Sequence, residues 1–222
     1  MTYTNKRTKI EHTYRIGNKE TKEVDTINDL GITLNSNLTW GPQIEKVTQK
    51  AYKKLGMVIR FCQPIKDIDT ITLLYKSLVR STIEYGSVVW YPKTKINMKT
   101  VERIQGQFVR YLFQKAEGFY PKYPTYIDYK TLIDNLPIDS IEERFTNNLL
   151  KLLHNIIHNS INSPYLLTEI KFRVPNPRLR NNPTQLFYIP NQNNNNLSKS
   201  PLIFAMEKYN ATNSNQVDLF IV

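Results

Sequence analysis

The chain contains one cysteine, three histidines and no long apolar run. A single cysteine, Cys62, excludes a disulfide within the chain and a zinc knuckle built on several thiolates. It follows Phe61 on an apolar face, so we expect a core thiol. No stretch approaches the roughly 20 apolar residues of a membrane-spanning helix, and the polar N-terminus lacks the apolar segment of a signal peptide. We therefore expect an intracellular protein, in the nucleus or cytoplasm, with no membrane partner.

Signatures of catalysis are also missing. The sequence has no glycine-rich phosphate loop and no Asp-Asp pair. Asp67 and Asp69 flank one residue at a predicted helix start, where N-capping explains them most simply. His154 and His158 lie four residues apart, but no third ligand accompanies them, so we interpret them as a solvent-facing pair favoured by the helix dipole. The sequence therefore gives no catalytic and no metal-ligating residue.

Positive charge is what the chain has in excess. Lys and Arg number 30 against 19 Asp and Glu, a net charge of +11. Such an excess indicates an acidic partner, most often nucleic acid and less often a membrane surface or an acidic protein. The alternative is that a chain rich in lysine and asparagine reflects genomic composition.

Apolar residues at helical spacing predict four helices. The first begins near Pro42, which is tolerated in a first turn, after Thr39 or Trp40 as cap. Its inward residues are Ile44, Val47, Ala51, Leu55, Val58 and Phe61. The second runs from Thr70 to about Arg80, capped by Asp69. The third has the inward residues Met98, Val101, Ile104, Phe108 and Leu112. The fourth opens with a capping box at 140–143, ends near His158 and has the inward residues Ile141, Phe145, Leu149, Leu153 and Ile156.

The two ends of the chain have other patterns. Residues 13–16 and 22–26 flank a turn signal at Gly17-Asn18, and residues 30–34 form a third run of β-prone side chains. Beyond residue 160, prolines and asparagines predict sparse regular structure. Three apolar residues of this tail are nevertheless expected to dock on the helical body: Leu202, Phe204 and Phe220.

The run from Leu74 to Pro92 is the most specific segment. It reads Leu-Tyr-Lys-Ser-Leu-Val-Arg-Ser-Thr-Ile-Glu-Tyr-Gly-Ser-Val-Val-Trp-Tyr-Pro. It resembles the segment just past the polymerase core in reverse transcriptases of non-LTR (LINE-type, jockey-like) retrotransposons. There a pattern close to Leu-Tyr-x-x-Leu-Val-Arg-Pro-x-x-Glu-Tyr-x-x-x-x-Trp-x-Pro recurs, and Ser81 stands where that pattern usually has proline. Leu30, Gly31 and Ile32 similarly resemble the end of a β-hairpin that holds the primer in these enzymes.

This resemblance implies a fold and a role. The expected fold is mainly α: a helical thumb-like bundle at 36–160, preceded by a small β-hairpin at 1–35 that resembles the end of the palm, and followed by an irregular C-terminal extension at 161–222. The implied partners are an RNA template and a DNA primer, or their hybrid, together with an upstream palm and fingers. The catalytic carboxylates and the Mg²⁺ ions of the complete enzyme would belong to that upstream part, so this chain is predicted to be inactive alone.

Two stripes of basic residues are the candidate contacts with nucleic acid. Lys46, Lys50, Lys53 and Lys54 follow one face of the first helix, with Arg60 further on, and Lys99, Arg103 and Arg110 follow the third helix. Basic helix faces can follow a phosphate backbone without reading its sequence. The alternative is a solvated face, and for Arg80 an internal ion pair with Glu84 is as good an interpretation as a phosphate contact.

Seven aromatic residues could stack on bases: Tyr75, Tyr85, Trp90, Tyr91, Phe108, Tyr111 and Phe113. Most of them lie on apolar stripes and are expected in the core. The segment 90–92 is the best exception, although a packed corner is favoured. A different function also stays open: an inactive relic or a helical protein-interaction domain that does not bind nucleic acid. Charge reversal at Lys46, Lys50 and Lys53 would distinguish the two functions.

Overall fold

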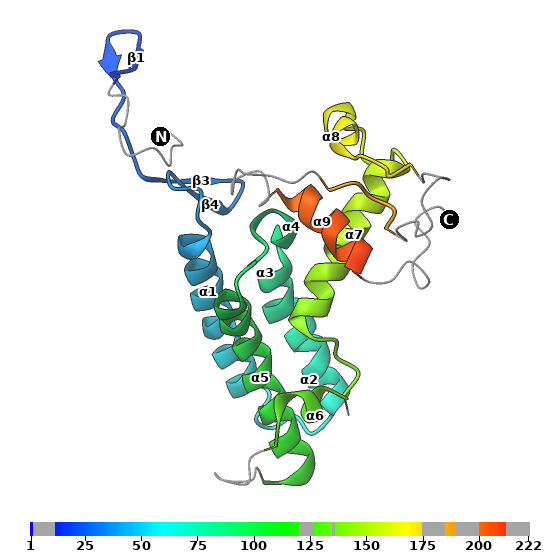
Figure 1. Cartoon of the computed structure of the whole chain (residues 1–222). Coiled ribbons are helices and arrows are strands. Elements are labelled where there is room, and N and C mark those ends of the chain that lie inside the picture. Colours follow the sequence, from blue (N-terminus) through cyan, green and yellow to red (C-terminus); the bar gives the residue numbers. More distant parts are fainter. Residues whose placement is uncertain (2–11, 120–126, 135, 175–184, 190–199, 212–222) are drawn as a thin grey trace. The chain divides into compact units, whose positions relative to one another are not determined.

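The computed structural model of the protein describes residues 1, 12–119, 127–134, 136–174, 185–189 and 200–211 (Figure 1). It is mainly α-helical with small β-hairpins near the N-terminus, as predicted. The chain forms two compact units: Met1–Gly86 with Pro92–Ser140, and Ser87–Tyr91 with Ile141–Val222. Within the described residues, no helix is both long enough and apolar enough to cross a membrane.

Two antiparallel hairpins begin the first unit. Strand β1 (Arg15–Ile16) pairs with β2 (Lys19–Glu20) around the predicted Gly17-Asn18 turn, and β3 (Thr26–Asp29) pairs with β4 (Ile32–Asn35). The second hairpin turns at Leu30 and Gly31, whose φ angles of 46° and 82° are both left-handed. This is the two-residue turn that matches strand twist. The prediction that Leu30 and Gly31 belong to a strand was therefore wrong, because they form the turn.

The first helix of this unit, α1 (Gly41–Phe61), has Trp40 at its N-cap and buries five of the six predicted residues. Phe61 is the exception, with 68% of its surface exposed at the helix end. Helix α1 packs on α5 (Lys95–Glu117), which starts at a Thr94 cap and buries all its predicted apolar residues. The next helix, the short α6 (Tyr129–Asp134), also packs on α5.

Between α1 and α5 the chain forms one continuous helical path, α2 (Ile68–Leu74), η1 (Tyr75–Arg80) and α3 (Ser81–Glu84). Asp67 is the N-cap, with its carboxylate accepting a 3.0 Å bond from the Thr70 amide, so the prediction of Asp69 as cap was wrong. The middle segment is a π-helix, a wider winding that is often found at functional sites. The hydroxyls of Ser77, Ser81 and Thr82 donate to carbonyls one turn earlier along it.

The second unit is built on the apolar face of α7 (Ile141–Ile157), whose five predicted inward residues are all buried. The short α4 (Ser87–Trp90) inserts Trp90, which is fully buried and meets Phe145 edge-on at 5.5 Å. Helix α8 (Pro164–Glu169) also packs on α7. Burying an indole of this size typically contributes about 3–5 kcal/mol relative to alanine, so this corner is a principal source of stability.

The tail contributes more regular structure than predicted. Helix α9 (Pro201–Ala211) packs on α7, because its Leu202, Ala205, Met206 and Tyr209 supply a buried face. Leu202 docks as predicted, and the ring of Phe204 lies 4.7 Å from that of Tyr91. Phe220, the third predicted docking residue, lies outside the described residues. The Asn210 side-chain amide donates to the Phe187 carbonyl and accepts from the Phe187 backbone amide. These two bonds hold the backbone at Phe187 against α9.

Candidate nucleic-acid interface

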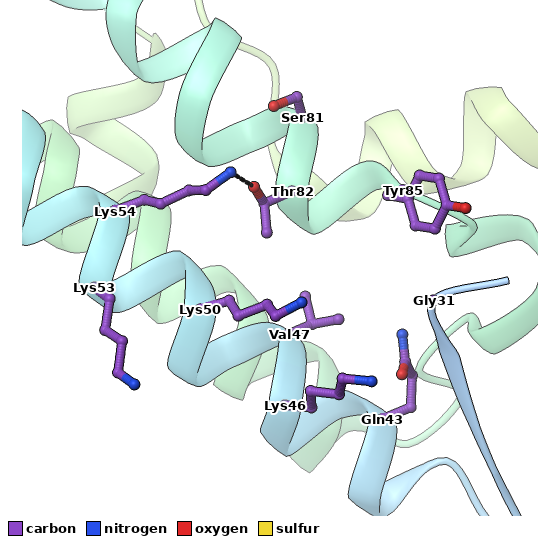
Figure 2. Close-up of a pocket in the computed structure, with 10 residues that line it drawn as sticks. All are labelled: Gly31, Gln43, Lys46, Val47, Lys50, Lys53, Lys54, Ser81, Thr82 and Tyr85. Carbon is purple, nitrogen blue, oxygen red and sulfur yellow. Dashed lines mark hydrogen bonds between the residues drawn. The ribbon is translucent and has the colours of Figure 1, made fainter. Parts of the chain in front are cut away.

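The predicted lysine stripe lines a groove in the first unit. The groove has a volume of about 540 Å³ and lies between α1, α3 and the β3–β4 turn (Figure 2). Its lining consists of Gly31, Gln43, Lys46, Val47, Lys50, Lys53, Lys54, Ser81, Thr82 and Tyr85. Among these described residues there is no Asp or Glu. Four lysines therefore line the groove without a carboxylate in its lining, which leaves a positive field for an anion.

Two of the four lysines also form hydrogen bonds that connect the walls of the groove. The Lys46 Nζ donates to Asn28 Oδ1 at 2.8 Å and to Thr33 Oγ1 at 3.0 Å, so it joins α1 to the hairpin. The Lys54 Nζ donates to Thr82 Oγ1 at 2.7 Å, which joins α1 to α3. Both acceptors are neutral, so these bonds leave the positive charges uncompensated. Lys46 and Lys54 thus combine a structural role with a charge at each end of the groove.

The other two lysines are exposed. Within the described residues, neither Lys50 nor Lys53 has a hydrogen-bond or ion-pair partner. Figure 2 shows Lys50 running along the groove between Lys46 and Lys54, whereas Lys53 points away from α3. Lys50 is therefore best placed to contact an anion inside the groove, and Lys53 adds charge at its rim.

The hairpin wall of the groove is held by two further side chains. Gln43, which is 1% exposed, accepts a 2.8 Å bond from the Thr33 amide through Oε1. The Tyr85 hydroxyl donates to the Leu30 carbonyl at 2.8 Å. A short two-stranded hairpin is marginally stable alone, so these contacts from α1 and α3 account for its fixed position. The primer-grip-like residues Leu30, Gly31 and Ile32 thus lie at one edge of the lysine groove.

The backbone conformation at position 31 favours glycine. Its φ of 82° is one that side chains rarely adopt, whereas a Cβ atom there would make only an ordinary van der Waals contact, 3.4 Å from Tyr85 Cε1. Leu30 has no such freedom, since a left-handed leucine costs on the order of 1–2 kcal/mol. The bond from Tyr85 offsets part of that cost. The turn is therefore a strained feature next to the groove.

The remaining predicted basic residues do not line the groove. Arg60 lies at the end of α1, and Lys99, Arg103 and Arg110 are exposed on α5. None of these four residues therefore forms a second wall of the groove. The structure thus brings together Lys46, Lys50, Lys53 and Lys54 with the turn at 30–32.

Arg80 forms the internal ion pair with Glu84 that was one of its two predicted roles. Its guanidinium Nε lies 3.5 Å from Glu84 Oε1, with both side chains largely buried. The neighbouring Tyr75 is fully buried, and its ring stacks on Phe108 at 3.8 Å. Burial raises the Tyr75 pKa far above its usual range, against a smaller lowering by Arg80. Arg80 therefore braces the helix interior, which argues against a phosphate contact there.

Sequence reasoning missed Gln43, Thr82 and Tyr85 as parts of the groove. Tyr85 was counted among aromatics expected mostly in the core, yet 59% of its surface is exposed. The segment 90–92, for which a packed corner was favoured over base stacking, is buried as predicted. Each had a signal in the sequence, because Thr82 and Tyr85 lie in the run that carries the resemblance and Gln43 lies three residues before Lys46 on the same helix.

Carboxylates in the described residues do not fit the Mg²⁺ ions that the resemblance implies for a complete polymerase. The Asp67 carboxylate accepts from both the amide and the hydroxyl of Thr70, which holds its pKa below the usual value, and Asp69 lies in the first helical turn. No group of three or more Asp, Glu, His or Cys side chains converges in the part of the chain that the structure describes. His154 and His158 stack on each other at 4.2 Å.

The comparisons with known proteins do not identify this site. No protein-family model matches the chain, and neither a curated protein nor a solved structure matches it. The resemblance to retrotransposon reverse transcriptases therefore stays a prediction.

Proposed function

We propose that the chain is the template–primer gripping portion of a retrotransposon RNA-directed DNA polymerase. The observation that carries the proposal is the lysine groove bordered by the turn at 30–32. Ammonium groups without carboxylates among the groove's lining residues suit a phosphate backbone, and they contact it without reading base sequence. The partners would be an RNA template and a DNA primer, together with a palm and fingers that supply the catalytic carboxylates.

The arrangement of the groove supports a gripping role. Lys46 and Lys54 are fixed by hydrogen bonds to the hairpin and to α3, so their charges are in place before a ligand binds. A preorganised site loses less freedom on binding. Lys46, Lys50 and Lys54 also follow one another at four-residue steps, about 6 Å apart along a helix axis. A row of charges with this spacing can contact successive phosphates.

The proposal is tested by measuring how tightly the protein binds a fluorescent RNA–DNA hybrid at increasing salt concentrations. We expect weak binding at low salt that falls steeply as salt rises, since bound lysines release counterions. No binding at low salt, or binding that salt does not change, would contradict it. Either result would favour the alternative, a relic or a protein-interaction domain.

A further inference from the structure

Tyr85 is an exposed aromatic side chain that is nevertheless held in place. Its hydroxyl donates to the Leu30 carbonyl at 2.8 Å, and its Cε1 lies 3.4 Å from the position that a Cβ atom on Gly31 would occupy. Yet 59% of the residue is exposed, whereas Tyr75, Trp90 and Tyr91 in the same run are buried. An aromatic ring that is both fixed and accessible can receive another flat ring without losing much freedom.

The surroundings of Tyr85 select the class of ligand. The ring lines the groove together with the lysines of α1 and the hydroxyls of Ser81 and Thr82 (Figure 2). Aromatic rings beside positive charges are the usual means of binding single-stranded nucleic acid, because each base has a face that can stack. A volume of about 540 Å³ lies within the roughly 300–1,000 Å³ range of pockets that enclose a small molecule. One nucleotide unit is of that class, whereas a whole duplex is not.

We propose that the groove binds one unpaired nucleotide of a strand, with its base stacked on Tyr85 and its phosphate facing Lys50 and Lys54. This inference rests on the proposed function and adds to it a preference for unpaired nucleotides over nucleotides inside a duplex. Inside a duplex, both faces of a base are covered by its neighbours. An end or an unpaired nucleotide offers a free face, so the groove selects such positions on a template–primer.

The test compares two short fluorescent strands of equal length and charge: a deoxyadenosine strand, and an abasic strand that keeps the sugars and phosphates but lacks the bases. Fluorescence anisotropy at one low salt concentration gives the affinity of each for the wild-type protein and for the Y85F and Y85L variants. We expect the wild type to prefer the deoxyadenosine strand by roughly tenfold, the order of one base stacked on an aromatic ring. Y85F keeps the ring and the preference. Y85L loses the preference, so it binds the two strands with similar affinity.

Three outcomes would overturn the inference. In the first, the wild type binds both strands equally and with steep salt dependence. This result would support phosphate contact by the lysines and contradict base stacking on Tyr85. In the second, Y85F and Y85L weaken both strands alike, which assigns Tyr85 to holding the turn through its hydroxyl. In the third, neither strand binds, and the proposed function fails with the inference. The wild-type comparison needs no variant, so a folding defect in Y85L leaves the test intact.

Discussion

Replacing Lys50 and Lys53 together by glutamine is the most informative change at the groove. Both side chains are exposed and have no partner among the described residues, so the free energy of unfolding should change by less than about 0.5 kcal/mol. The hydrogen bonds that connect the walls of the groove come from the other two lysines, Lys46 and Lys54. The variant therefore removes half of the groove's charge and leaves its walls in place.

The expected effect follows from counting charges. If all four groove lysines contact phosphates, the logarithm of the binding constant falls with the logarithm of salt concentration at a slope of about −3.6 for a duplex. Binding then weakens about 150-fold between 50 and 200 mM salt. The double variant should show a slope of about −1.8 and a loss of about 12-fold over the same range. Titrations of a fluorescent RNA–DNA hybrid at several salt concentrations give both slopes.

A matched control is available in the same unit. Lys66 and Lys130 are also exposed, and replacing both by glutamine lowers the net charge by the same amount. This control should keep the wild-type slope, because its charges lie outside the groove lining. Equal slopes for the groove variant and the wild type would show that Lys50 and Lys53 do not contact phosphates. An equal change in both variants would also contradict binding in the groove, since it would indicate binding by overall charge alone.

Three other predictions concern the fold. Tyr75→Phe leaves the buried Gln105 Oε1 without its 3.0 Å donor, so chemical denaturation should show a loss of about 1–3 kcal/mol, and an unchanged midpoint would contradict this role. Hydrogen bonds from Thr70 lower the Asp67 pKa, so the cap stabilises above the unfolded pKa of about 3.9 and is lost as pH falls through the lower folded value. The Tm of Asp67→Ala should therefore lie below that of the wild type at neutral pH and approach it in strong acid; a constant difference would count against the carboxylate. Burial raises the pKa of the Cys62 thiol, so a thiol reagent should react with it only after denaturation, and rapid labelling of the native protein would show that it is accessible.

The helices and their buried faces could be predicted because their signal is local. The apolar lines of α1, α5 and α7 follow helical spacing, and burial matches it at nearly every position. The prediction that Phe61 is buried was wrong because Phe61 is the last residue of α1, where 68% of its surface is exposed. Helix α9 was missed because prolines and asparagines dominate the composition of the tail. Packing against α7 stabilises it despite that composition.

The groove could be predicted only in part. The lysines share one face of one helix, so their spacing alone placed them together. Thr82 and Tyr85 join them from a part of the chain that lies 28 or more residues after Lys54, through contacts between different elements. Such contacts have no period in the sequence. The π-helical winding before α3 was likewise not visible in the spacing of Leu74 to Arg80.

The central claim, that the lysine groove grips nucleic acid, is tested most directly by a lysine footprint. The protein is treated with an amine-acetylating reagent alone and with a saturating RNA–DNA hybrid, and mass spectrometry measures the modification of each lysine. Binding in the groove should make the hybrid protect Lys50 and Lys53 several-fold, whereas Lys66 and Lys130 react as before. Equal modification of Lys50 and Lys53 with and without the hybrid would contradict it.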